Sequence, residues 1–399
     1  MFYDFEKYGD SEIIALGNSL SYTGVNPSII EEKLGCSAFS LGVDAGRSDA
    51  YLALTKHVFS KYNPKLLLVT FDPYLKMLEQ EDLSVQVKLS PFLSPINRIE
   101  YLLGTLQGDA TDIGRFFPWT FYHPTSFADW KANLKNKLFP DARYKATVQR
   151  LNEAGKYYDH KGFVGQKGVR EKESEKAERK LMREDYTPFS EHMKKNLREI
   201  KKICLKHDCK LVFVVPPYIR NILLADERQS NAMQAIEEFC REEQISLFNF
   251  AFAKEGLMED LSPYYRDASS HLNMDGAQIY TEALCNVLQT YQASGDISQY
   301  FYSKDEWFAS VDYISKAWCN VERRKGYIYF YGHALYGTTV QPEYRYTIVH
   351  EDGTESVLQD WSSNTKFSIE EQRAENCKIY LYVRNASQPS QNPIPYLCE

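Results

Sequence analysis

The sequence lacks several features that would mark particular classes of protein. No apolar run approaches the roughly 18 residues that a membrane-spanning helix needs, and no signal peptide is visible. The formal net charge of −7 gives no basic excess, which argues against a nucleic-acid partner. The eight cysteines form no Cys-x-x-Cys pair, which argues against a zinc site, and their scatter favours buried free thiols.

The chain also has little sequence ahead of its first apolar run. Met1-Phe-Tyr-Asp-Phe is an abrupt start. We therefore expect that a membrane anchor or signal precedes this segment in the native protein, and that the protein acts outside the cytoplasm, in the cell envelope. A cytoplasmic location is the alternative, because free thiols argue mildly against a strongly oxidising compartment.

What the chain does have is length and many aromatic residues. Its 399 residues favour two domains over one. Aromatic residues make up 14% of the chain, including 29 Tyr and 22 Phe. These rings predict either a Tyr-rich core and β-sheet or exposed platforms that stack on sugars.

The stretch around Ser19 is the first candidate site. A short apolar run from Ile13 to Leu16 predicts a buried strand, which breaks at Gly17-Asn18-Ser19. A helical pattern follows from Pro27, where the missing proline N–H is tolerated. Ser19 therefore follows a strand and precedes a helix, where open α/β sheets bind ligands. The alternative is that Ser19 is only a turn residue or a helix cap.

A second stretch supplies partners for a reactive serine. Asp267-Ala-Ser-Ser-His271 precedes a helical pattern that begins near Asp275. A nucleophilic serine needs a base within hydrogen-bonding distance, and the base needs an orienting group. Ser19, His271 and Asp267 are therefore the candidate catalytic residues.

The two stretches together resemble the SGNH (GDSL-like) hydrolase superfamily, over roughly the first three quarters of the chain. The resemblance implies a nucleophile at Ser19, a base at His271 and no metal or cofactor. It implies an oxyanion hole made by the N–H groups of Ser19 and Gly46, with Gly42 as the alternative to Gly46. The family spacing is Asp-x-x-His, one residue shorter than here. Either Asp267 orients His271 through a bulged turn, or a backbone carbonyl takes that role.

The third conserved block of that superfamily is altered in this chain. Phe71-Asp72-Pro73-Tyr74 stands where GDSL members carry Gly-x-Asn-Asp, so the Asn donor is missing. The altered block resembles members that modify cell-envelope polysaccharides, such as alginate O-acetyltransferases and the D-alanyl transfer proteins of teichoic acid systems.

Side chains near the expected site edge are candidates for substrate binding. We assign that role to Asn18, Asp72, Tyr74 and Tyr218. Asp44 and Arg47 flank the Gly46 loop, where they either bind a polar substrate or pair with each other.

The order of elements predicts an α/β fold for residues 1–302. Apolar runs at 13–16, 37–43, 65–70, 210–215 and 245–250 alternate with helical patterns, which predicts a three-layer sandwich with a central parallel sheet, SGNH/flavodoxin-like. Residues 75–187 interrupt this alternation and are expected to be an insertion, partly helical and charged. Its aromatic part at 115–130 either caps the site or packs as a helical subdomain.

Residues 303–399 predict an accessory all-β sandwich. Short alternating runs at 327–331, 344–349, 355–358 and 378–383 have a turn signal at 351–353. The domain either binds glycans, through rings such as Trp361, Tyr331 or Tyr344, or serves only as a packing module.

These features together predict an SGNH-type serine acyl hydrolase or O-acyltransferase that acts on acyl, expected acetyl, esters of a cell-envelope or extracellular polysaccharide. The expected partners are a carbohydrate or acylated polysaccharide and a membrane-bound acyl donor protein. The alternative is a catalytically weakened polysaccharide-binding scaffold with the same fold.

Overall fold

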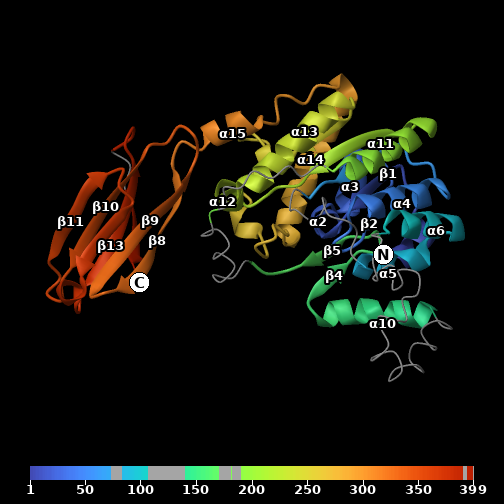
Figure 1. The fold of residues 1–399 in the computed structure, drawn as a ribbon. Helices are drawn as coiled ribbons and strands as arrows, with labels where there is room; N and C mark the ends of the chain where they lie inside the picture. The colour runs from blue at the N-terminus through green and yellow to red at the C-terminus, as the bar shows by residue number, and fades with distance from the viewer. Residues whose placement is uncertain (73–82, 107–139, 170–180, 182–189, 390–392, 399) are drawn as a thin grey trace. The chain divides into compact units, whose positions relative to one another are not determined.

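A computed structural model describes residues 1–72, 83–106, 140–169, 181, 190–389 and 393–398. Within them the chain forms two compact units (Figure 1). The first holds residues up to Phe301, apart from Leu181 and the stretch Arg220–Glu227. The second holds that stretch, Leu181 and the chain from Tyr302 onward.

A five-stranded parallel sheet forms the centre of the first unit. Its strands are β1 (Ile13–Gly17), β2 (Ala38–Gly42), β3 (Leu66–Thr70), β6 (Lys210–Val215) and β7 (Ser246–Asn249), in the order β2-β1-β3-β6-β7. This is the flavodoxin-like order, with the reversal between β1 and β3. All five residues of β1, β2 and β3 are buried, as their uninterrupted apolar runs predict. The predicted central parallel sheet is confirmed.

Helices flank this sheet on both faces. They are α1 (Phe2–Tyr8), α2 (Ser19–Gly24), α3 (Pro27–Leu34), α4 (Ser48–Phe59), α11 (Glu191–Lys206), α13 (Glu227–Glu242) and α14 (Met274–Ser294). Helix α4 packs against α11, and α3 packs against α14. Right-handed crossovers in this strand order place the two pairs on opposite faces, which makes three layers. Within the described residues, no helix combines the length and apolar character needed to cross a membrane.

The expected insertion at 75–187 is described only in part. It contains helices α5 (Leu83–Leu89), α6 (Pro95–Gly104) and α10 (Pro140–Glu153), as its partly helical character predicts. It also contains a hairpin of β4 (Lys156–Tyr158) and β5 (Val164–Gln166), which the sequence pattern did not reveal. The aromatic stretch at 115–130 and most of the charged run lie outside the described residues.

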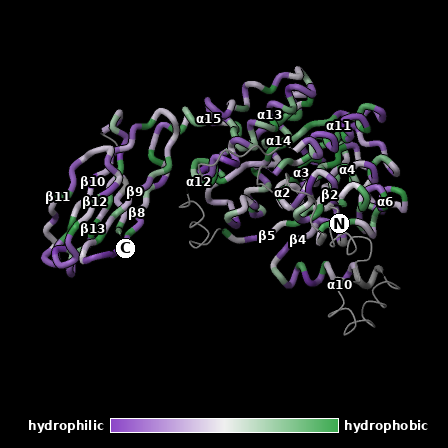
Figure 2. The backbone as a smooth tube through the Cα atoms, in the orientation of Figure 1, coloured by the Kyte–Doolittle hydropathy of each residue, from purple (hydrophilic) through white to green (hydrophobic). Residues whose placement is uncertain are grey.

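The second unit contains two antiparallel sheets. One has the order β11-β10-β13-β14 and the other β12-β9-β8. The strands are β8 (Ile314–Arg324), β9 (Tyr327–Tyr336), β10 (Pro342–Val349), β11 (Glu355–Ser362), β12 (Lys366–Glu370), β13 (Lys378–Asn385) and β14 (Ile394–Cys398). Two short helices complete it, α12 (Arg220–Ala225) and α15 (Lys304–Ser310). Hydrophilic and hydrophobic residues alternate along β9 and β13 (Figure 2).

Buried side chains from both sheets join one core in this unit. Phe330 of β9 and Tyr346 of β10 lie in that core, and so does Tyr344, which is 4% exposed. Tyr344 therefore cannot offer its ring to a sugar, contrary to one expectation above. Trp361 has the Arg384 guanidinium over its ring at 4.2 Å, so that ring face is covered.

The cysteines are all free thiols. Five are buried, whereas Cys36, Cys377 and Cys398 are half-buried. The prediction of buried free thiols is confirmed for the five and too strong for the other three.

Candidate active site

Ser19 begins helix α2 directly after the break that ends β1. Asn18 caps this helix with its side-chain Oδ1, which accepts the Leu20 N–H at 3.0 Å. Gly17 lies opposite Gly42 in the sheet register. A Cβ on Gly17 would approach the Ser21 and Thr70 Cβ atoms to 2.7 and 2.8 Å, so only glycine allows this tight approach. The strand end and the cap together fix the position of Ser19.

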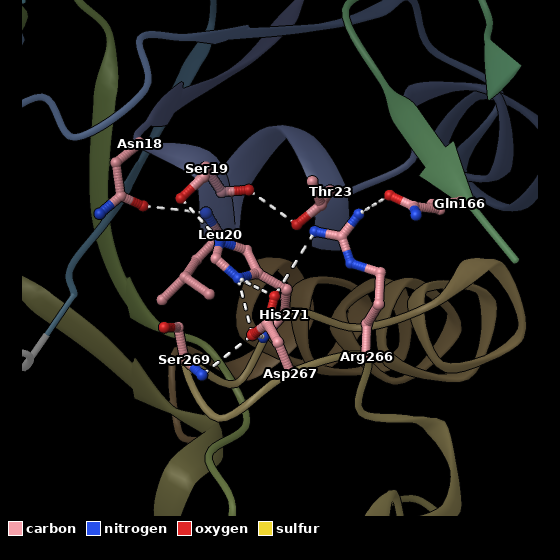
Figure 3. A network of polar contacts seen from close by, with 9 residues as sticks. All are labelled: Asn18, Ser19, Leu20, Thr23, Gln166, Arg266, Asp267, Ser269 and His271. Carbon is pink, nitrogen blue, oxygen red and sulfur yellow. Dashed lines mark hydrogen bonds and ion pairs between the residues drawn. The ribbon is translucent and has the colours of Figure 1, made fainter. Parts of the chain in front are cut away.

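The structure brings together the three residues that the sequence selected as catalytic (Figure 3). Ser19 Oγ lies 2.8 Å from His271 Nε2. His271 Nδ1 lies 3.0 Å from Asp267 Oδ1 and 2.9 Å from Oδ2. With Nδ1–H donated to the carboxylate, Nε2 is free to accept the Ser19 proton. This is the hydrogen-bonded order of nucleophile, base and orienting acid.

The extra residue between Asp267 and His271 is absorbed by a bulged turn. Ser270 has φ of 62°, in the left-handed region, and is 2% exposed. The Arg266 N–H donates to the His271 carbonyl at 2.7 Å, which closes the turn. Asp267 Oδ1 accepts the N–H of Ser269 at 2.9 Å and that of His271 at 3.4 Å. Of the two alternatives for orienting His271, the structure shows the carboxylate of Asp267.

The environment of Asp267 keeps its carboxylate ionised. Burial alone raises the pKa of this carboxyl, but the hydrogen bond and the charge of His271 outweigh it. Two backbone N–H groups add to the effect, and the net pKa lies below the ordinary 3.8. A permanent negative charge therefore faces Nδ1 of the imidazole.

The oxyanion hole differs from the expectation. The Gly46 N–H donates to the Val43 carbonyl at 3.0 Å and closes a turn, so it is not directed at an acyl oxygen. The alternative donor, the Gly42 N–H, lies 3.1 Å from the Met1 sulfur. Within the described residues, no acceptor forms a hydrogen bond with the Ser19 N–H. The Gly46 N–H is therefore engaged in the turn, although Gly46 lines the pocket, and the Ser19 N–H stays the candidate oxyanion donor.

Three of the four candidate substrate-binding residues contact one another. Asn18 Nδ2 donates to Asp72 Oδ2 at 2.9 Å, and the Tyr218 hydroxyl donates to Asp72 Oδ1. Asn18 and Tyr218 are buried. Their polar groups therefore hold the strand ends of β1, β3 and β6 together. Asn18 and Asp72 also line the pocket, whereas Tyr218 is not among its lining residues. Tyr74 lies outside the described residues.

A pocket of about 160 Å³ opens at Ser19 and His271. Its walls include Leu20, Asp44, Ala45, Gly46, Asp72 and Ser269. Asp44 forms an exposed ion pair with Lys88 at 3.3 Å, and Arg47 is buried. Of the two alternatives for these residues, a surface pair between Asp44 and Arg47 therefore does not form. Within the described residues, no group of three or more His, Cys, Asp or Glu side chains is placed to hold a metal ion.

Sequence reasoning missed the support that the β4–β5 hairpin gives to this site. The Arg266 guanidinium donates to Gln166 Oε1 of β5 and lies 3.9 Å from Asp267 Oδ2 (Figure 3). Asn273, the N-cap of α14, donates its side-chain N–H to the Gly168 carbonyl at 3.0 Å. The hairpin, through Gln166, and the segment just after it, through Gly168, thus hold the two ends of the loop that carries Asp267 and His271. No local sequence signal marks contacts between residues about a hundred positions apart.

Comparison with known proteins adds similar structures but no family assignment. No family model matches the chain, and no curated protein matches it. A GDSL-like lipase from Bacteroides thetaiotaomicron VPI-5482 aligns with 73% of this chain and 99% of its own, at 8% identity and a TM-score of 0.30. A gut microbial diltiazem-metabolizing enzyme aligns with 92% of this chain and 73% of its own, at 12% identity and a TM-score of 0.32. At these scores the similarity carries no argument, so the functional reading depends on the site itself.

Proposed function

We propose that this protein is a serine acyl hydrolase or O-acyltransferase of the SGNH type. The observation that carries the proposal is the continuous contact from Ser19 Oγ through His271 to the Asp267 carboxylate, at 2.8 and 2.9 Å. Its substrates are esters, and an acetyl ester of a cell-envelope or extracellular polysaccharide is the class we favour. The small pocket of about 160 Å³ is consistent with a short acyl group.

The proposed reaction has two steps. Ser19 Oγ attacks the acyl carbonyl carbon while His271 Nε2 takes the hydroxyl proton, and the Ser19 N–H stabilises the oxyanion. His271 then returns the proton to the leaving alcohol as the ester C–O bond breaks, which leaves an acyl-serine. Water (in a hydrolase) or a sugar hydroxyl (in a transferase) then attacks the acyl-serine and gives its proton to His271. His271 returns that proton to Ser19 Oγ as the bond between Oγ and the acyl carbon breaks, which releases the acid or the new ester. Asp267 holds the imidazole throughout.

The second candidate function is a polysaccharide-binding scaffold that has lost most of its catalytic power. The commitment of the Gly46 N–H to a turn favours it, because one missing oxyanion donor costs about 3 kcal/mol of transition-state stabilisation. Under that reading the Ser19–His271 contact is a remnant of the fold.

Labelling with a fluorophosphonate distinguishes the two candidates. The wild-type protein should be labelled at one serine, and Ser19→Ala should lose the label. Ser28→Ala, a substitution at an exposed serine of α3, is the matched control and should keep it. Absence of wild-type labelling supports the scaffold, and labelling that survives Ser19→Ala rejects the mechanism.

Aryl-acetate turnover with and without an acetyl acceptor distinguishes hydrolase from transferase. We expect slow release in buffer and faster release when an oligosaccharide is added, with mass spectrometry showing the acylated oligosaccharide. Ser19→Ala should abolish both reactions, and His271→Ala should nearly do so. Fast release that no acceptor changes would reject the transferase reading.

A further inference from the structure

The outer face of one sheet in the second unit carries a row of tyrosines. Along β9, residues alternate strictly, with Ile328 and Phe330 in the core and Tyr327, Tyr329 and Tyr331 on the other face. Tyr327 is 40% exposed, and the other two tyrosines are half-buried. The ring centroids of Tyr327 and Tyr329 lie 6.4 Å apart.

Polar side chains border this row on both sides. The residues of β8 that pair with the three tyrosines are Arg324, Glu322 and Asn320, and those of β12 are Glu370, Ser368 and Lys366. All six are exposed. Because paired residues share a face of the sheet, the tyrosines form the central column of a three-column array. We call these nine residues the tyrosine face.

The row ends in a cavity at the β8–β9 turn. The cavity measures about 700 Å³, and its lining includes Tyr327, Arg323, Glu370, Glu371, Gln372 and Glu375. The Tyr327 hydroxyl lies 3.4 Å from Glu370, and Arg323 lies 3.8 Å from Glu371. Carboxylates line this cavity. However, within the described residues no cluster of three or more His, Cys, Asp or Glu side chains is arranged to hold a metal ion, there or elsewhere. A divalent cation is therefore a poor fit.

The chemistry of this surface fits a neutral polysaccharide. Tyrosine rings present flat, partly apolar platforms with a polar edge, which suit the C–H face of a pyranose ring. Carboxylates, amides and a serine hydroxyl nearby accept or donate hydrogen bonds to sugar hydroxyls. The flanking columns balance two cations, Arg324 and Lys366, against two carboxylates, Glu322 and Glu370. This balance selects neither an anionic nor a cationic polymer.

We propose that the tyrosine face, with the adjoining cavity, is a binding site for a neutral polysaccharide chain. The site does not include any group of the Ser19 pocket, so it does not depend on the proposed ester chemistry. Arg324 lies over one face of the Tyr329 ring at 4.5 Å, and Lys366 lies over one face of the Tyr331 ring at 5.9 Å. A sugar therefore stacks on the opposite face of each of these two rings.

Affinity electrophoresis of the full chain tests the proposal. The gels contain barley β-glucan, xylan or galactomannan as neutral probes, and polygalacturonate or chitosan as charged ones. We expect at least one neutral polysaccharide to retard the wild type. Tyr327→Ala/Tyr329→Ala should weaken that binding at least tenfold. The matched control is Tyr380→Ala/Tyr382→Ala, which removes two half-buried tyrosines from alternating positions of β13 and should change the affinity less than twofold.

Further measurements test whether the tyrosine face binds polysaccharide independently of the Ser19 site. Ser19→Ala should bind as the wild type does, which separates this site from the proposed catalysis. Aryl-acetate turnover should be equal in the two double variants. Absence of retardation by all three neutral polysaccharides, stronger retardation by a charged one, or equal losses in the two double variants would each overturn the proposal.

Discussion

Two opposing influences act on the pKa of the Asp267 carboxyl. Burial raises the pKa of its carboxyl, whereas His271 and two backbone N–H groups lower it, and the lowering prevails. A folded-state pKa below the unfolded value means that the ionised carboxylate stabilises the fold above the ordinary 3.8. That stabilisation is lost as the pH falls through the folded-state value.

An NMR titration of the Asp267 carboxyl carbon should show this balance directly. In the wild type the midpoint should lie below 3.8. In His271→Ala the burial remains while the chief lowering influence is gone, so the midpoint should move upward. A midpoint that is the same in both proteins would contradict the attribution to His271.

Replacement of the same carboxylate should reduce catalysis strongly. The stretched spacing suggests an imperfect orienting group and only a mild effect of Asp267→Asn. The observed contact of both carboxylate oxygens with Nδ1 predicts instead a loss of about 10³- to 10⁴-fold in kcat, because an amide stabilises the wrong tautomer. Aryl-acetate kinetics measure it, and Asp260→Asn, on an exposed loop, is the control. A loss of less than tenfold in kcat would mean that another group orients the His271 imidazole.

Elements position these residues by tight turns that only certain backbones permit. The loop from Asp267 to His271 needs the left-handed conformation of Ser270, and its Oγ accepts the Ile219 N–H at 3.3 Å. The end of β1 needs the absence of a side chain at Gly17. The site therefore depends on two backbone positions that do no chemistry themselves.

Substitutions at Ser270 should separate backbone strain from the lost hydrogen bond. Both Ser270→Ala and Ser270→Gly remove the acceptor for the Ile219 N–H. Only glycine relieves the cost of the left-handed conformation, about 1 kcal/mol. Thermal denaturation should therefore rank the free energy of unfolding as wild type, then the glycine variant, then the alanine variant. Equal stability of the two variants would show that this turn relaxes.

A methyl group at Gly17 should disturb both stability and catalysis. It would lie 2.7 Å from the Ser21 Cβ and 2.8 Å from the Thr70 Cβ, so Gly17→Ala must shift the turn that presents Ser19. We expect a lower melting temperature and at least a hundredfold lower kcat. The control is Gly24→Ala, where the new Cβ meets Tyr280 at an ordinary 3.4 Å. Full activity of Gly17→Ala would mean that Ser19 tolerates displacement.

The strands of the central sheet could be predicted from the sequence because each is marked by a local run of apolar residues. Leu66-Leu-Leu-Val-Thr70, for example, is a continuous apolar run, and β1 and β2 are equally buried. The β4–β5 hairpin could not be predicted, because its strands have three residues each and show no alternation of apolar and polar residues. Ser19, His271 and Asp267 were found from the order of their motifs. The role of Asp72 could not be found, since its partner Tyr218 is 146 positions away.

At the scale of the whole molecule, the two units are not consecutive stretches of chain. Helix α12 lies between strands of the first unit in sequence but belongs with the second, where it packs on β9. Ser315 Oγ donates to Asn221 at 2.5 Å within that unit. A boundary after residue 302 would therefore separate α12 from the unit with which it groups.

Truncation after residue 302 should for this reason leave α12 without its partners. Ile222, Leu223 and Leu224 are at most 7% exposed in the full chain. We expect the 1–302 fragment to be less soluble and to melt at a lower temperature, by size-exclusion chromatography and thermal denaturation. Adding Leu223→Ser and Leu224→Ser to the fragment should restore part of the solubility. An intact, monomeric fragment with the full-length melting temperature would contradict this.

The contacts of Arg266 with Gln166 and of Asn273 with the Gly168 carbonyl have a consequence for engineering. A loop that carries an acid and a base invites transfer to another α/β scaffold as a short cassette. Here the cassette has two pieces, since the hairpin that supports the loop is encoded a hundred residues upstream. A graft of residues 265–273 alone would carry the reactive groups without the part that holds them in register. A graft should therefore include residues 156–168 as well. A chimera that takes these two segments from different homologues should lose function, as should a variant in which either segment is disrupted.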